Sequence, residues 1–144
     1  MGTFTVFDHT ADVGLEVRGE GLADLLATAA RAAFDQMLED WPEKAVLTEE
    51  VTVLPPPGLE GDLGELLVTW LQELLFRFET RRLVPLEFGF AAADAKEVRA
   101  RVGFGRFELG RHRTRLEIKA VTYHELRVRR EPDGAWSARF IMDV

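Results

Sequence analysis

The chain has 144 residues, of which 47% are hydrophobic and 30% charged, a composition that suits one globular domain spanning residues 1–144. It contains no cysteine, which excludes disulfides, thiolate catalysis and cysteine-ligated zinc. The formal net charge of −7 argues against a general nucleic-acid binder, which usually needs a basic face. We find no signal-peptide pattern and no run of about 20 apolar residues that could span a bilayer, so we expect a cytoplasmic protein without a membrane partner.

The N-terminal part of the sequence predicts two strands and a helix. Apolar side chains alternate around Phe4 and Val6, and alternation resumes over residues 13–17, so each stretch predicts a strand. A polar break, residues 8–12, separates them. Apolar residues then recur at helical spacing over residues 22–38, and we expect Pro42 to end this helix because proline has no N–H to donate.

The middle of the chain predicts a strand and a second, longer helix. Residues 46–54 favour a strand, and residues 55–58 form a stiff Pro-Pro-Pro-Gly connector. Asp62 followed by Glu65 has the spacing of a helix-capping box. The apolar stripe behind it comprises Leu63, Leu66, Leu67, Trp70, Leu71, Leu74, Leu75 and Phe78. We expect this stripe, including Trp70, to belong to the core.

From residue 86 onward the hydrophobic period changes to two. Residues 86–92 and 98–104 predict a hairpin, and residues 109–114 form a polar connector. Alternation from Leu116 to Val128 predicts one long strand, and a turn at residues 131–134 leads into a last strand over residues 136–142. Two helices and about seven mainly antiparallel strands predict an α+β fold, a two-layer α/β sandwich with both long helices on one face of the sheet.

Two acidic motifs stand at opposite ends of the sequence. The first contains Asp8, His9 and Asp12, and the chain ends with Asp143 and Val144, whose main-chain carboxylate we expect to be free. If the two motifs lie on neighbouring strands, their carboxylates converge and repel one another unless a cation lies between them. A set of oxygen ligands suits Ca²⁺ or Mg²⁺ better than Zn²⁺. His9 could ligate the ion or orient a carboxylate.

The same residues are open to other interpretations. Asp8 and Asp12 could cap backbone groups as Asx turns, with Gly14 relaxing the backbone, or could act in acid–base catalysis. A second polar set, Lys119, Tyr123 and His124, could belong to a half-buried strand. The sequence lacks a Gly-rich phosphate loop and a nucleophile elbow, so it offers little machinery for catalysis.

Three motifs together resemble the archease family: residues 8–14 (DHTADVG), residues 119–124 (KAVTYH) and residues 136–144 (WSARFIMDV). Their order and the chain length match over essentially the whole sequence. The resemblance implies a small non-catalytic protein that activates the GTP-dependent RNA-splicing ligase in tRNA splicing and RNA repair. Such a protein promotes guanylylation of the ligase and its multiple turnover, and would meet RNA only through the ligase.

The resemblance also implies a metal site. Asp12, Asp143 and Val144 correspond to the ligands of a divalent cation, for which we expect Ca²⁺, with Mg²⁺ or Mn²⁺ as alternatives. Asp8 and His9 are candidates to support these ligands.

A ligase-contacting surface is expected at Arg111, His112, Lys119, Tyr123 and His124. The connector departs from the family pattern, because residues 109–113 are basic around the Arg-His pair where the family tends to be acidic. Two rival functions remain open at this point: a metal-dependent phosphoesterase, and a general chaperone or interaction module whose metal is structural.

Overall fold

The computed structural model describes residues 2–9 and 12–144, without the side chains of Asp8 and His9. The described residues form two helices and eight strands, which confirms the predicted α+β class. The helices are α1 (Leu22–Met37) and α2 (Leu63–Arg81). The strands are β1 (Thr3–His9), β2 (Asp12–Gly19), β3 (Leu47–Val53), β4 (Leu83–Ala93), β5 (Val98–Arg106), β6 (Ala120–Val121), β7 (Arg127–Arg130) and β8 (Trp136–Asp143).

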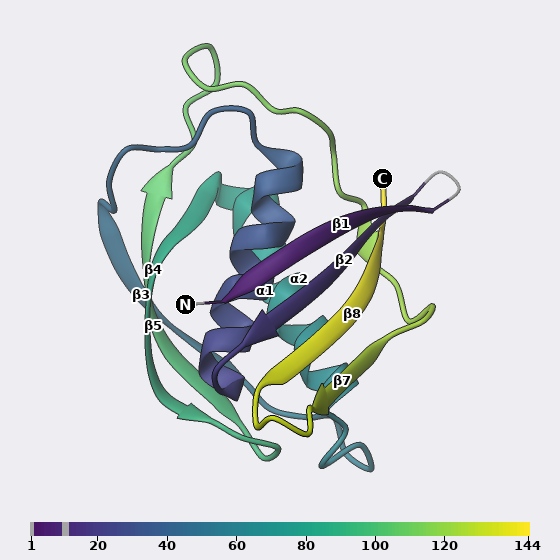
Figure 1. Cartoon of the computed structure of the whole chain (residues 1–144). Coiled ribbons are helices and arrows are strands. Elements are labelled where there is room, and N and C mark those ends of the chain that lie inside the picture. Colours follow the sequence, from purple (N-terminus) through teal and green to yellow (C-terminus); the bar gives the residue numbers. More distant parts are fainter. Residues whose placement is uncertain (1, 10–11) are drawn as a thin grey trace.

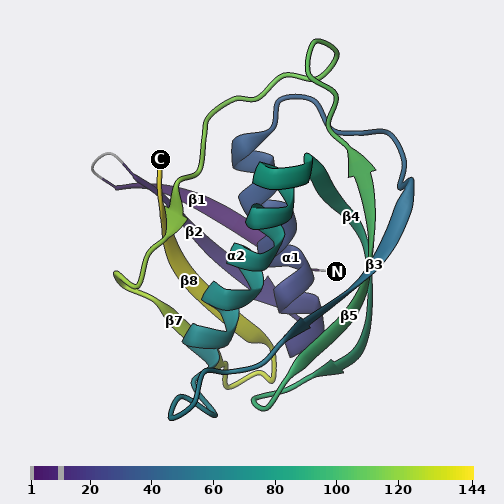
Figure 2. The ribbon, with the colours of Figure 1, turned by 180° about the vertical axis from the view of Figure 1, so that it is seen from behind.

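The strands divide into two antiparallel sheets. The larger has the order β1-β2-β8-β6, with β7 also paired to β8, and the smaller has the order β3-β5-β4. Both helices contact strands of both sheets and lie between them (Figures 1 and 2). The expected arrangement differs from the structure here, since one sheet with both helices on one face was predicted. Alternation shows which face of a strand is apolar, but it does not show which strands are neighbours.

The helices are joined through a buried tryptophan. Trp70 on α2 is fully buried, and its indole Nε1 donates a hydrogen bond to the carbonyl oxygen of Leu26 on α1 at 2.9 Å. This satisfies the one polar group that burial of a tryptophan would otherwise leave unpaired. The predicted core position of Trp70 is confirmed.

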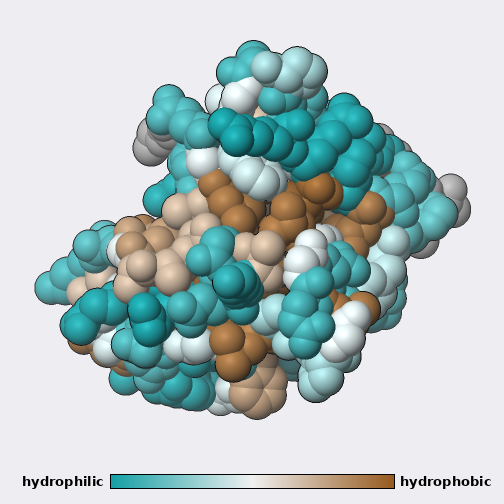
Figure 3. Space-filling model, turned by 90° about the horizontal axis from the view of Figure 1, so that it is seen from below, coloured by the Kyte–Doolittle hydropathy of each residue, from teal (hydrophilic) through white to brown (hydrophobic). Residues whose placement is uncertain are grey.

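At the end of the molecule where the β4–β5 and β7–β8 turns lie, apolar side chains reach the surface between hydrophilic ones (Figure 3).

The two helices begin and end by different means. The side chain of Asp62 accepts a hydrogen bond from the Glu65 backbone N–H at 3.0 Å, so the predicted N-terminal cap of α2 is confirmed. Helix α1 ends at Met37, and Leu38 is already extended. The prediction that Pro42 ends this helix is wrong, because the chain leaves the helix several residues earlier. None of the described helices is long and apolar enough to cross a membrane.

The prediction of one long strand from Leu116 to Val128 is also wrong. That stretch forms only the short strands β6 and β7, which pair with different parts of β8. A turn separates them, in which the Leu126 N–H donates to the Tyr123 carbonyl oxygen at 3.3 Å and Glu125 adopts a left-handed backbone with φ of 55°. Apolar residues keep the same phase on both sides of this turn, and the polar Thr122 and His124 between them do not by themselves indicate a turn.

Candidate metal centre

The two acidic motifs meet in one row of the larger sheet. The register of β2 and β8 places Asp12 directly opposite Asp143. On the outer sides of this pair, His9 of β1 lies opposite Asp12, and Ala120 of β6 lies opposite Asp143. Figure 1 shows the C-terminus beside the ends of β1 and β2. We call these four positions the acidic row.

Asp12 and Asp143 point to the outer face of the sheet because their neighbours along the strands face the helices. Val13 pairs with Met142, and the Met142 side chain is fully buried against the core. Successive side chains of a strand point to opposite faces, so Asp12 and Asp143 lie on the outer face. Directly opposed side chains in an antiparallel pair have their Cβ atoms about 4.5–5.5 Å apart, and like charges so placed destabilise the pairing. A cation held between the carboxylates would remove that cost.

An aromatic ring covers the sheet next to the acidic row. Gly14 lies opposite Phe7 on one side and Ile141 on the other. A Cβ atom on Gly14 would come within 2.1 Å of the Phe7 ring, so the ring lies directly across the glycine. Ile141 is fully buried although it points to the outer face. Gly14 therefore makes room for the Phe7 ring, a role that the sequence analysis missed when it assigned this glycine to backbone flexibility.

The arginine closest to this ring is already neutralised. The guanidinium of Arg139 lies 3.9 Å from the centroid of the Phe7 ring. It donates hydrogen bonds to Glu16 and to Glu125, each at 2.7 Å. Two carboxylates and an aromatic face therefore hold this positive charge on the middle of the sheet.

The oxygen donors of the acidic row fit a hard cation in type, but the described part of the row supplies few of them. Asp12 is half-buried and Asp143 is exposed, and the main-chain oxygens of Val144 follow directly. The described residues contain no group of three or more His, Cys, Asp or Glu side chains placed to hold a metal. The side chains of Asp8 and His9 lie outside the described residues. Ca²⁺ takes about six to eight oxygen ligands, so water or a partner would complete the set.

The motif of residues 119–124 is attached to β8 beside the acidic row. The Lys119 N–H donates to the carbonyl oxygen of Asp143 at 2.8 Å. The N–H and the hydroxyl of Thr122 both donate to the carbonyl oxygen of Ile141, at 2.9 and 3.0 Å. The three motifs that resemble one family are thus brought together on neighbouring strands.

Tyr123 and His124 lie in the exposed turn that follows. Tyr123 is 59% exposed, and its hydroxyl donates to Glu65 of α2 at 3.1 Å. Desolvation, helped by the Glu65 carboxylate, raises the pKa of Tyr123. His124 lies 3.2 Å from a carboxylate oxygen of Glu125. Of the predicted strand through this motif, only Ala120 and Val121 form one.

Arg111 and His112 belong to a different neighbourhood. Arg111 pairs with Glu43 at 2.9 Å and with Glu108 at 3.3 Å. The Nδ1 atom of His112 accepts a hydrogen bond from the Glu108 N–H at 2.9 Å, and its ring packs against Phe107. His112 is half-buried. The contacts of these two residues do not connect them to the acidic row.

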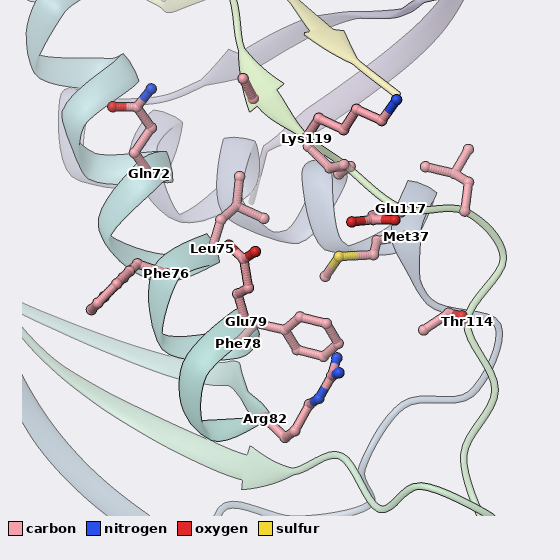
Figure 4. Close-up of a pocket in the computed structure, with 13 residues that line it drawn as sticks. Met37, Gln72, Leu75, Phe76, Phe78, Glu79, Arg82, Thr114, Glu117 and Lys119 are labelled. Atoms are coloured by element: carbon pink, nitrogen blue, oxygen red, sulfur yellow. The ribbon is translucent and has the colours of Figure 1, made fainter.

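A pocket of about 530 Å³ lies between α2 and the segment that leads into β6. Figure 4 shows Met37, Leu75 and Phe78 directed into it. The lining also includes Glu79, Arg82, Glu117, Lys119 and Ala120. This pocket was not predicted from the sequence, because a paired strand was expected over Leu116 and its neighbours, where the structure has none.

Comparison with known proteins agrees with the three motifs. Residues 4–144 match the archease protein family. The archease of Methanopyrus kandleri is 36% identical over 140 residues, which cover 95% of this chain and 96% of that protein. The archease of Pyrococcus furiosus is 32% identical over 142 residues, with 96% of each chain covered.

The fold is shared with a solved structure as well. The solution structure of Methanobacterium thermoautotrophicum protein 1598 superposes with a TM-score of 0.77 at 30% identity, covering 98% of both chains. The chain belongs to the archease family.

Proposed function

We propose that this chain is an accessory protein of RNA ligation in tRNA processing. Its specific role would be to activate the GTP-dependent RNA-splicing ligase, by promoting guanylylation and multiple turnover. Family membership supports the general role. The observation that carries the specific one is the direct pairing of Asp12 with Asp143 on the outer face of the sheet, where a partner has access.

A divalent cation at the acidic row is part of this proposal. Asp12, Asp143 and a main-chain oxygen of Val144 would hold it, and Asp8 and His9 are candidates to support them. The donor set is rich in oxygen, which favours Ca²⁺ and leaves Mg²⁺ or Mn²⁺ as alternatives. When bound, the ion would supply positive charge that offsets the repulsion between β2 and β8 and could accept an oxygen ligand from the partner.

Contact with the ligase would take place beside the row. Lys119, Tyr123 and His124 are exposed there, and backbone hydrogen bonds hold their segment against β8. Activation follows if this surface binds the reactive conformation of the ligase better than the resting one, since differential affinity is what shifts such an equilibrium. The chemistry of RNA joining would stay with the ligase.

RNA would be met only through the ligase. The two arginines that make the connector basic are matched by carboxylates: Arg111 pairs with Glu43, and Arg113 lies 3.3 Å from Asp40. These ion pairs leave the connector with less positive charge for phosphate groups than its sequence indicates. Arg111 and His112 would therefore form at most a separate, outlying part of the ligase surface.

Multiple-turnover ligation by the cognate ligase with GTP tests the proposal. We expect the wild-type chain to raise turnover and Asp143→Asn, which keeps the side-chain shape, to lose the effect. Glu117→Gln is the matched control, since it removes an exposed carboxylate from the neighbouring segment and should activate like wild type. An Asp143→Asn variant that activates the ligase as well as wild type would show that activation does not depend on a metal at the acidic row.

The rival functions predict other outcomes. Hydrolysis of phosphoesters by the chain alone, abolished in Asp143→Asn, would identify a phosphoesterase. Protection of unrelated proteins from aggregation, unchanged in Asp143→Asn, would identify a general chaperone. A wild-type chain that leaves the ligase rate unchanged would contradict the accessory role itself.

A further inference from the structure

Strand β1 is an open edge that carries no charge over most of its length. Within the described residues it pairs with β2 alone. Residues 3–7 read Thr-Phe-Thr-Val-Phe, with no charged residue and no proline. Edge strands are usually protected by lysine, proline or a bulge, because an unprotected edge pairs with other chains. Phe4 and Val6 are 37% and 48% exposed, although strand alternation points both toward the helices.

A hollow lies beside this edge on the helix-facing side. A pocket of about 360 Å³ is lined by Phe4 together with Trp41, Pro85 and Leu86. Arg31 and Asp35 of α1 complete the lining. A further strand added to β1 would lie over this part of α1, and its inward side chains would enter the hollow.

We propose that a second copy of this chain occupies the edge, with the two β1 strands paired antiparallel about a two-fold axis at Thr5. A two-fold interface uses the same patch on both copies, so the patch must complement itself. In this register Phe4 lies opposite the partner's Val6, and Thr3 lies opposite the partner's Phe7. The pairing places an aromatic and a β-branched side chain together on the buried face, which is a favourable cross-strand combination.

Other registers match less well. An axis at Val6 would place Phe4 opposite the partner's Asp8, and an axis at Phe4 would pair Val6 with the partner's Gly2. An axis between two residues would place Phe4 opposite the partner's Thr5 or Phe7, and would pair side chains that point to opposite faces of the sheet. The Thr5 register is the one that matches all five uncharged residues. The interface involves neither Asp12 nor Asp143, so it is independent of the proposed metal.

Cysteine cross-linking tests the register directly because the chain has no cysteine of its own. In the Thr5→Cys variant the two sulfurs lie opposite each other, with Cβ atoms about 4.5–5.5 Å apart, close to disulfide geometry. In Thr3→Cys, on the same face of the same strand, the two cysteines are separated by four residues along the strand, about 13 Å. On oxidation with diamide we expect Thr5→Cys to form mainly a covalent dimer and Thr3→Cys to form no covalent cross-link. Equal cross-linking of the two variants, or none in either, overturns the proposal.

The mass in solution supplies a second measurement. By light scattering we expect the wild-type chain to approach twice its 16.3 kDa as concentration rises. Val6→Lys should weaken dimerisation by at least about tenfold, because a lysine on the edge opposes strand pairing. Val46→Lys is the matched control, with a valine 53% exposed outside the edge, and should dimerise like wild type. A wild-type chain that stays monomeric, or a dimer that Val6→Lys leaves intact, would refute pairing through β1.

Discussion

The acidic row and the basic connector differ in how their charged side chains are paired. In the row, the strand register brings Asp12 and Asp143 directly opposite each other, although they are far apart in the sequence. In the connector, Arg111 lies against Glu43, and the Arg113 N–H donates to Asp40 at 2.9 Å. Both segments are strongly charged in the sequence, but the strand register places like charges opposite each other in the row, whereas the arginines of the connector meet opposite charges.

The difference indicates where a ligand is needed. An ion pair at the surface contributes little to the stability of the fold, and its two charges already balance each other without a ligand. Like charges across a strand pair cost free energy in the folded chain, and a bound cation converts that cost into affinity. A cluster of charge in a sequence therefore becomes informative only once its partners across the fold are known.

The largest expected effect tests whether the acidic row needs a cation, by measuring the free energy of unfolding with and without calcium. At a Ca²⁺ concentration a hundredfold above the dissociation constant, binding should raise the free energy of unfolding of the wild-type chain by about 2.7 kcal/mol. Asp143→Asn should lose this response. In EDTA the same variant should be more stable than wild type by about 0.5 kcal/mol, because one of two opposed charges is gone. Urea unfolding in Ca²⁺ and in EDTA measures both effects.

Glu117→Gln is the control for the loss of one negative charge. It removes an exposed carboxylate that is not in the acidic row, so its calcium response should equal that of wild type. A calcium response in Asp143→Asn as large as in the control would show that the opposed pair does not hold the ion.

The second prediction concerns the sheet beside the row. Gly14→Ala should lower the free energy of unfolding by about 2 kcal/mol, because the new methyl group collides with the Phe7 ring and the strands must shift to admit it. Thermal unfolding measures the loss. Since Gly14 is close to Asp12 and opposite Ile141, the variant should also weaken Ca²⁺ binding.

Gly89→Ala is the matched control, again in a strand. The nearest atom to a Cβ there is 3.8 Å away, so the methyl group has room. This variant should be at least as stable as wild type, since alanine loses less backbone entropy on folding than glycine. If Gly14→Ala were equally harmless, the Phe7 ring would not be fixed over the glycine.

Local features of the fold were predictable because they depend on short-range chemistry. The capping box at Asp62 and the burial of Trp70 follow from spacing along one helix, and both are confirmed. The outward direction of Asp12 follows from the period of two in its strand. These features require no knowledge of distant parts of the chain.

The remaining features depend on which strands become neighbours. The pairing of Asp12 with Asp143 requires β2 to lie beside β8, a choice that alternation does not encode. The turn between β6 and β7 contains no glycine or proline, and Glu125 adopts its left-handed backbone without either signal. The contact of Gly14 with the Phe7 ring was predictable from the register of the hairpin, since pairing His9 with Asp12 places Phe7 opposite Gly14.

The smallest effect is expected in the connector, where it tests the claim of self-neutralisation. Hydrogen bonds from the backbone and side chain of Arg113 lower the pKa of Asp40 below its usual value of 3.8. A carboxyl whose pKa is depressed on folding contributes stability above its unfolded pKa and loses it as pH falls through the folded pKa. Asp40→Asn should therefore be slightly less stable than wild type at neutral pH, and the stabilities of the two proteins should converge well below pH 3.8.

Because the pair is exposed, the difference in the free energy of unfolding should stay close to the precision of urea unfolding. The substitution should also leave the calcium response unchanged. A large stability loss at neutral pH, or a weakened calcium response, would show that the connector and the acidic row are coupled and would end the contrast between them.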